Sequence, residues 1–107
     1  MMGTGATADF SVDEGPDDFD ACLMNLQGHS NIVASVCFNH DGSQVASGSV
    51  DKTVKVWNAK TGDLVQTLEG HGSFVMSVCF NHDGSQLASG SWDETVKVWN
   101  ANPNYRR

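Results

Sequence analysis

Serine, histidine and aspartate occur together twice in this chain, and these are the residue types of the catalytic triad that performs acyl transfer. Each group has a histidine, a serine 18 positions later and an aspartate four positions after that serine. The two groups are His29, Ser47 and Asp51, and His71, Ser89 and Asp93. A second serine in each group, Ser49 or Ser91, is an alternative member. The residue types alone would allow a serine nucleophile with a histidine base.

A working triad needs more than these three residue types. The sequence contains no Gly-x-Ser-x-Gly nucleophile elbow and no evident oxyanion hole. The group also occurs twice at equal spacing, which is typical of a structural device that is repeated with the fold. We therefore expect no enzymatic activity, and the sequence indicates neither a cofactor nor a metal site.

Both groups belong to an internal repeat with a period of 42 residues. When residues 28–58 are aligned with 70–100, 24 of the 31 positions are identical. Each unit consists of short β-branched and apolar runs separated by turn signals such as Asp-Gly, in which glycine accepts a positive φ. In the first unit the predicted strands are 32–38, 44–49, 53–57 and 64–68. This spacing predicts an antiparallel meander of four strands.

The residue pairs that recur in both units also follow a fixed order. Gly-His is followed by Asp-Gly and then by Ala-Ser-Gly-Ser-x-Asp-x-Thr-Val-Lys-Val-Trp, twice in the same order. This pattern resembles the WD40 repeat over about residues 20–102, with units at 20–58 and 62–100. One departure is Trp-Asn, at Asn58 and Asn100, in place of the closing Trp-Asp. The resemblance implies an all-β fold of two four-stranded antiparallel blades of a β-propeller, and a non-enzymatic scaffold that binds other proteins.

The histidine, serine and aspartate groups resemble the polar set that supports WD40 blades, together with a tryptophan of the third strand. That tryptophan is Trp57 in the first unit and Trp99 in the second. The histidine can donate to the aspartate and accept from the serine hydroxyl, while the indole N–H supplies a further donor. We expect these residues to form a structural polar network in each blade.

The resemblance also implies that the outer strand of each blade precedes the Gly-His pair of the next repeat. Residues 64–68 then complete the first blade, 21–27 are an outer strand without a blade, and the second blade has no outer strand beside 95–99. Two blades leave faces exposed, and repeat folds generally need at least three units. We expect copies to associate head to tail into a ring, with four chains preferred and three as the alternative. A truncated fragment of a larger WD40 protein is the second interpretation.

The positions that differ between the two units indicate where a partner binds. Apart from the exchange of Val45 for Leu87, they follow Gly-His or lie in the turn after the second strand, and in the family these regions share one face. The expected partner-binding residues are Ala34, Val50 and Lys52 in the first unit and Phe74, Met76, Trp92 and Glu94 in the second. Tryptophan and methionine are enriched at interfaces, which makes Trp92 the first candidate.

Two alternatives to partner binding remain for some of these residues. Phe74 and its counterpart Ile32 could instead be buried between the blades. Trp92 beside Glu94 would also suit a propeller that binds glycans or small ligands.

The composition narrows the classes of partner. The 107 residues carry 13 acids and six Lys and Arg, a net charge of −7. Six of the acids lie in residues 1–20, so we expect 1–19 to be a disordered acidic tail. The remainder is nearly neutral, so it has no basic stripe for nucleic acid, and it has no apolar run long enough for a membrane span. Residues 103–107 are expected to be a short C-terminal tail. Three widely spaced cysteines indicate free thiols in an intracellular, cytoplasmic protein, with Cys37 and Cys79 buried.

Overall fold

The computed structural model describes residues 21–102, which fold into seven β-strands. The strands are β1 (Val33–Phe38), β2 (Gln44–Ser49), β3 (Thr53–Asn58), β4 (Leu64–Glu69), β5 (Val75–Phe80), β6 (Gln86–Ser91) and β7 (Val96–Asn100). Within this range no helix is long and apolar enough to cross a membrane. The expected tails at 1–19 and 103–107 lie outside the described residues.

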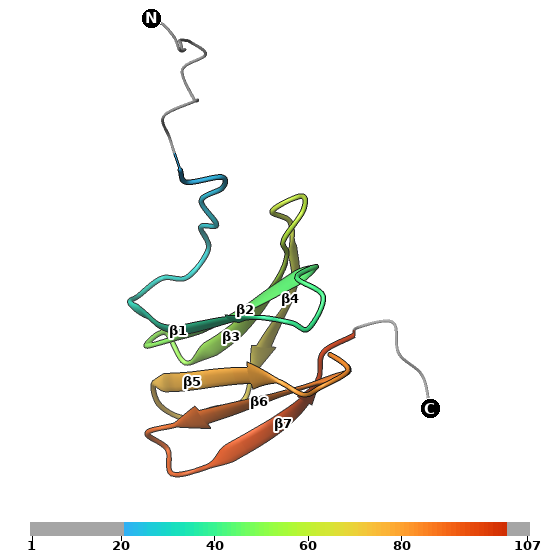
Figure 1. Cartoon of the computed structure of the whole chain (residues 1–107). Coiled ribbons are helices and arrows are strands. Elements are labelled where there is room, and N and C mark those ends of the chain that lie inside the picture. Colours follow the sequence, from blue (N-terminus) through green and yellow to red (C-terminus); the bar gives the residue numbers. More distant parts are fainter. Residues whose placement is uncertain (1–20, 103–107) are drawn as a thin grey trace, which may run out of the picture.

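The strands form two antiparallel sheets, in the order β1-β2-β3-β4 and β5-β6-β7 (Figure 1). The prediction of an all-β chain with two repeated sheets is therefore confirmed. The β1–β2 hairpin forms where Asp-Gly predicted it, because Gly42 has a φ of 77° and Asp41 Oδ1 accepts the N–H of Ser43 at 2.9 Å. Gly84 has the same φ in the β5–β6 hairpin.

The first sheet has all four expected strands. β4 pairs with β3 so that Leu68 lies opposite Val54, which confirms that residues 64–68 complete the first blade. The second sheet ends at β7, and among the described residues no strand pairs with the outer edge of β7. The assembly of sheets is thus open rather than closed.

Residues 21–27 differ from their prediction, because the structure assigns them no strand. They run beside the first sheet, where Leu26 Cδ2 and Met24 Sδ lie 3.5 and 3.6 Å from the Cβ position of Gly62. A strand is held by backbone hydrogen bonds to a neighbouring strand, and the outer edge of β3 is already occupied by β4. The place beside β3 that the repeat would give this segment is therefore already taken in the first sheet.

The core lies between the two sheets, and we call this contact the internal joint. Its fully or nearly fully buried side chains are Ala46, Val54, Val56, Val75, Val78, Leu87 and Ala101. Gly48 allows the closest approach, since a Cβ at this position would lie 2.8 Å from Val75 Cγ1 and 3.0 Å from Val78 Cγ1. The Val78 N–H also donates to Ser35 Oγ across the joint at 3.3 Å. These contacts bind one face of the first sheet to one face of the second.

Two expectations of burial are wrong. Cys79 is exposed because the face of the second sheet that carries it has no described element against it, and Cys37, which packs against the internal joint, is only half-buried. Ile32 is exposed rather than buried between blades, while its counterpart Phe74 is half-buried. The burial of Cys37 raises the pKa of its thiol.

Candidate functional site

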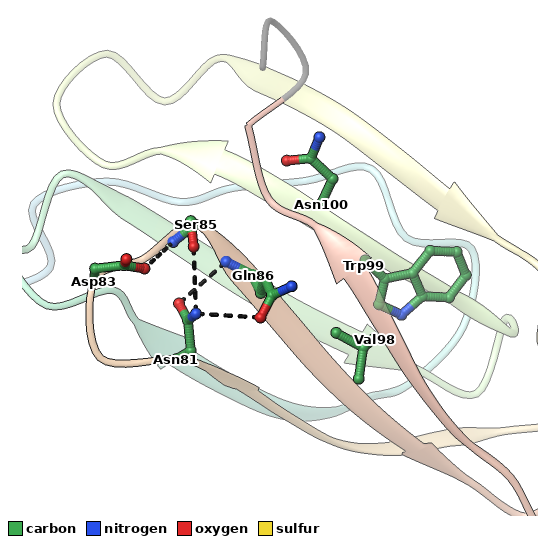
Figure 2. Close-up of a pocket in the computed structure, with 7 residues that line it drawn as sticks. All are labelled: Asn81, Asp83, Ser85, Gln86, Val98, Trp99 and Asn100. Carbon is green, nitrogen blue, oxygen red and sulfur yellow. Dashed lines mark hydrogen bonds between the residues drawn. The ribbon is translucent and has the colours of Figure 1, made fainter. Parts of the chain in front are cut away.

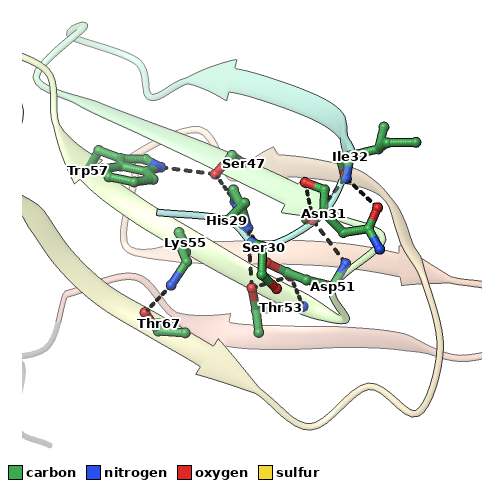
Figure 3. A network of polar contacts seen from close by, with 11 residues as sticks. His29, Ser30, Asn31, Ile32, Ser47, Asp51, Thr53, Lys55, Trp57 and Thr67 are labelled. Atoms are coloured by element: carbon green, nitrogen blue, oxygen red, sulfur yellow. Dashed lines mark hydrogen bonds and ion pairs between the residues drawn. The ribbon is translucent and has the colours of Figure 1, made fainter. Parts of the chain in front are cut away.

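The first polar group is assembled from four parts of the first blade (Figure 3). His29 precedes β1, Ser47 lies on β2, Asp51 lies in the β2–β3 turn, and Trp57 lies on β3. His29 Nδ1 is 2.8 Å from Asp51 Oδ2, and His29 Nε2 is 2.6 Å from Ser47 Oγ. The Trp57 indole N–H donates to the same Ser47 hydroxyl oxygen at 2.9 Å. The four side chains form one continuous network.

The donors and acceptors of this network fit one arrangement of protons. The Trp57 indole can only donate, so the Ser47 oxygen accepts from it. The Ser47 hydroxyl can then donate to His29 Nε2, and His29 Nδ1–H can donate to Asp51 Oδ2. Every polar atom named here has a partner, which makes the network rigid and costly to interrupt.

Asp51 makes further hydrogen bonds that hold its turn. Its Oδ1 accepts the Thr53 hydroxyl at 2.6 Å and the Thr53 N–H at 2.9 Å, and its Oδ2 accepts the Ser30 N–H at 3.1 Å. Burial alone would raise the pKa of Asp51, but the bonds from Thr53, His29 and Ser30 outweigh it and hold this pKa well below its usual range. The aspartate is therefore ionised and joins the turn to the segment that enters β1.

The second sheet repeats the network with the same geometry. His71 Nδ1 is 2.8 Å from Asp93 Oδ2, His71 Nε2 is 2.7 Å from Ser89 Oγ, and the Trp99 indole donates to Ser89 at 2.8 Å. The Thr95 hydroxyl donates to Asp93 Oδ1 at 2.6 Å. This bond is the main cause that holds the pKa of Asp93 well below its usual range.

The sequence interpretation did not include the two threonines or assign a role to the alternative serines. Ser49 Oγ donates to the Ile32 carbonyl at 2.8 Å and accepts the Asp51 N–H at 3.0 Å, so it also joins the turn to the start of β1. The signal for the threonines was present in the sequence. Asp-x-Thr recurs at Asp51 and Asp93, and an aspartate commonly accepts the N–H two residues ahead of it.

The network has the contacts of a catalytic triad, but its serine hydroxyls are not accessible to a substrate. Ser47 is 4% exposed and Ser89 is 2% exposed. The serine oxygen already accepts an indole N–H, so it is enclosed by its own partners. A nucleophile must reach a substrate carbonyl, and this geometry holds the hydroxyl inside the blade instead. The arrangement favours support of the loops over catalysis.

The partner-binding candidates of the first unit surround the same turn. The Val50 N–H donates to the Ile32 carbonyl at 2.9 Å, and Lys52 is exposed with a φ of 79°. Ala34 lies at a register shift between Val33 and Ser35 in the β1–β2 pairing. Such a bulge changes the direction of a side chain relative to its sheet.

In the second unit the corresponding residues are larger. The Phe74 and Trp92 rings are tilted by 42° with centroids 4.8 Å apart, and the Trp92 N–H donates to the Phe74 carbonyl at 3.0 Å. Met76 lies at the register shift between Val75 and Ser77 and is exposed. Trp92 is 64% exposed, and Glu94 is exposed with a φ of 74°. The structure thus brings Phe74 and Trp92 into contact at the end of the sheet where the polar network lies.

Comparison with models of protein families shows to which family this chain belongs. The model of the WD domain, G-beta repeat, matches residues 20–58 and 62–100. The chain belongs to the WD40 repeat family. Its two sheets are therefore WD40 blades, and each blade carries one of the two polar networks described above.

Curated proteins with similar sequences support the same family. The chain is 54% identical over 45 residues to vegetative incompatibility protein HET-E-1 of Podospora anserina, which is 42% of this chain and 3% of that protein. It is 52% identical over 46 residues to protein Mut11 of Chlamydomonas reinhardtii (43% of this chain, 12% of that protein). It is 37% identical over 65 residues to mitochondrial division protein 1 of Mycosarcoma maydis (61% and 8%). The matches span only a small part of each relative.

Three cavities of the WD40 blades are lined by neither Trp92 nor Glu94. A cavity of about 400 Å³ at the opposite end of the second blade is lined by the seven residues of Figure 2, among them Asn81, Asp83 and Asn100. Asn81 and Asp83 use their side chains to hold the β5–β6 turn, since Asn81 Oδ1 accepts the Gln86 N–H at 3.1 Å and Asp83 Oδ1 accepts the Ser85 N–H at 2.9 Å. The alternative of a glycan or small-ligand site at Trp92 and Glu94 gains no support from these cavities.

Proposed function

We propose that this chain is a non-enzymatic interaction scaffold that binds another protein or peptide through the end of the blades where Trp92 lies. The observation that carries the proposal is the contact of Trp92 with Phe74. Phe74 supports one side of the indole, while most of the Trp92 surface remains open to solvent. A large aromatic side chain that is supported yet exposed is typical of residues that carry binding energy.

The surroundings of Trp92 suit this role. Met76 supplies an adaptable apolar side chain at the bulge, and Glu94 supplies a charge at the adjacent turn. Asp93, between Trp92 and Glu94, holds the turn through its network with His71. A turn that is already ordered loses less conformational entropy when it binds. In the first unit, Ala34, Val50 and Lys52 offer a smaller surface of different charge, so the two blades would contact different parts of a partner.

We further propose that copies of the chain associate head to tail into a ring, in which the site is repeated. Four copies would give eight blades and three copies six, both within the usual size of propellers. Repetition at fixed spacing would raise the avidity for a multivalent partner. No disulfide joins the cysteines within residues 21–102, in keeping with a reducing compartment.

Selection of peptides that bind the full chain tests this function. Peptides are selected on the wild-type chain from a display library, and their affinities are then measured for Trp92→Ala and Met76→Ala. The control is Lys60→Ala, which removes an exposed side chain of the β3–β4 turn. We expect Trp92→Ala to weaken binding by more than tenfold and Lys60→Ala to leave it unchanged. Equal affinities for the three variants and the wild type would contradict the proposed site.

A further inference from the structure

The two blades are equivalent sheets that bury opposite faces in the internal joint. The residues that one blade buries therefore have counterparts on the face that the other blade leaves open. The first blade contributes Val54 and Val56 to the internal joint, and both are fully buried. Their counterparts on the second blade, Val96 and Val98, are 74% and 64% exposed. This open face of the second blade has the residue types that form one half of the internal joint.

The other half of the joint is left open on the first blade. In the joint the second blade contributes Val75, which is fully buried, and Val78, which is 6% exposed. Their counterparts on the first blade are Val33 and Val36, which are both exposed, and Val36 is 63% exposed. The open face of the first blade therefore matches the half of the joint that the second blade already uses.

Glycines show the same relationship in steric terms. Gly48 lies in the joint, where a Cβ would lie 2.8 Å from Val75 Cγ1. Its counterpart Gly90 has only the Ser77 Cβ within 4 Å of its own Cβ position, at 4.0 Å. Within the described chain nothing therefore requires glycine at position 90. A valine of another blade would require it, as Val75 does at position 48.

A small apolar cavity marks where the incoming blade would insert. It has a volume of about 180 Å³ and lies on the open side of the second blade, with Cys79, Ala88 and Val98 among its lining residues. The equivalent residues of the first blade, Cys37, Ala46 and Val56, pack in the joint with Phe80. Phe38 is the counterpart of Phe80 and is exposed. In a second copy of the chain, Phe38 could therefore take the place beside Cys79, Ala88 and Val98 that Phe80 takes beside their equivalents in the internal joint.

We infer that the open face of the second blade binds the open face of the first blade of another copy, with Val33 and Val36 of that copy against Gly90. The inference deepens the head-to-tail association proposed above and rests on it. The contact repeats the internal joint between molecules. It is heterologous, so an open row of copies keeps one free face at each end until the ring closes.

The same contact would place residues 21–27 beside the open outer edge of β7 in the other copy. By the repeat, 22–27 correspond to β4, which pairs with β3. In the partner's sheet, Leu26 would lie opposite Val96 and Met24 opposite Val98, as Leu68 and Gln66 lie opposite Val54 and Val56. Exposed sheet edges of this kind readily accept a strand from another chain.

The segment already carries the side chains for this position. Leu23 is 94% exposed in the single chain, whereas its counterpart Val65 packs against the core. Leu26 corresponds to Leu68, which also packs against the core. A Cβ at Gly28 would lie 3.0 Å from Trp57 Cη2, just as a Cβ at Gly70 would lie 3.1 Å from Trp99 Cη2, so the segment leaves its own blade from the equivalent place.

The test compares the solution mass of the full chain with that of Gly90→Val, by light scattering over a concentration series. The wild type is expected near four times the 11.5 kDa of the chain, and Gly90→Val near the mass of one chain with an unchanged far-UV circular dichroism spectrum. The control is Gly72→Val, which adds the same side chain at an exposed loop glycine where the first unit has Ser30. This control is expected to keep the wild-type mass.

A second variant tests the donated strand independently. Leu23→Asp changes a side chain that is exposed in the single chain, and it is expected to lower the mass without loss of the sheets. A wild type that remains a single chain, or a Gly90→Val chain that assembles like the wild type, overturns the inference. The partner site at Trp92 is judged separately by peptide affinity, so a monomer that still loses binding in Trp92→Ala keeps the proposed partner site and contradicts only the assembly.

Discussion

The hydroxyl of Ser47 on β2 lies 2.6 Å from Nε2 of His29, in the segment that enters β1. This contact joins two positions 18 residues apart, and the second blade repeats it between Ser89 and His71 at 2.7 Å. Because the same serine also accepts the indole N–H of Trp57, it connects three parts of one blade through a single oxygen. The stability of the blade should therefore depend on this atom.

Ser47→Ala is predicted to lower the free energy of unfolding by about 1–3 kcal/mol, because it leaves the His29 Nε2 and the Trp57 indole N–H without their partner in a buried place. Chemical denaturation of the full chain measures the change. Ser30→Ala is the control, since the structure shows only the backbone N–H of Ser30 in the network. If Ser47→Ala were as stable as the Ser30→Ala control, this result would contradict the structural role of the network.

Stability is predicted to fall as the pH drops below about 4. The pKa values of Asp51 and Asp93 are depressed in the folded chain, against an unfolded value of about 3.9. In this range the unfolded chain binds more protons than the folded one, so acid favours unfolding. The contribution is complete above the unfolded pKa and is lost as the pH falls through the folded pKa. Melting temperatures measured from neutral pH to pH 3 should fall less steeply in the double variant Asp51→Asn, Asp93→Asn.

Lys52→Gly is predicted to raise the free energy of unfolding by about 0.5–1 kcal/mol. Lys52 has a φ of 79°, a conformation that costs a side-chain-bearing residue roughly 1–2 kcal/mol and glycine nothing, while glycine loses more entropy on folding. Thermal melting checks the change. The control is Lys60→Gly at an exposed turn residue without a positive φ, which should be neutral or destabilising. A loss of stability in Lys52→Gly would show that the lysine side chain holds the turn.

Val45→Leu is predicted to strengthen the association of copies. Val45 corresponds to Leu87, which is fully buried in the internal joint, so the proposed joint between copies contains one CH₂ less. Burial of one CH₂ contributes about 0.8 kcal/mol, which is roughly a fourfold tighter dissociation constant. Sedimentation over a dilution series measures this constant. Weaker association would mean that Val45 faces a surface unlike the one that Leu87 meets.

The local signals in the sequence predicted the strands closely. Asp41-Gly42 predicted a hairpin that the structure places between β1 and β2, since the carboxylate and the glycine act within a few residues of each other. The alternation of Thr53, Val54 and Lys55 predicted the two faces of β3, and Val54 is buried while its neighbours are half-buried. Strand propensity and turn chemistry are properties of short segments, and in this chain the same signals occur in both repeats.

Burial was less predictable, because it depends on what lies against each face. Cys37 and Cys79 occupy the same place in their units, yet one is half-buried and the other exposed. The exposure of Val54 and its counterpart Val96 differs even more, since Val54 is fully buried and Val96 is 74% exposed. A periodic pattern shows that a side chain faces one side of a sheet, but it does not show whether another sheet covers that side.

The sequence by itself determined the repeat, the family and the residue types of the polar networks, because these follow from spacing along the chain. Only the tertiary structure decided which of the two serines joins His29, which face of each blade is covered, and that residues 21–27 lie outside any strand. The physical reason is that hydrogen bonds and burial are made by atoms that fold together from distant positions. Identical residues such as Gly48 and Gly90 therefore acquire different surroundings from their neighbours in space.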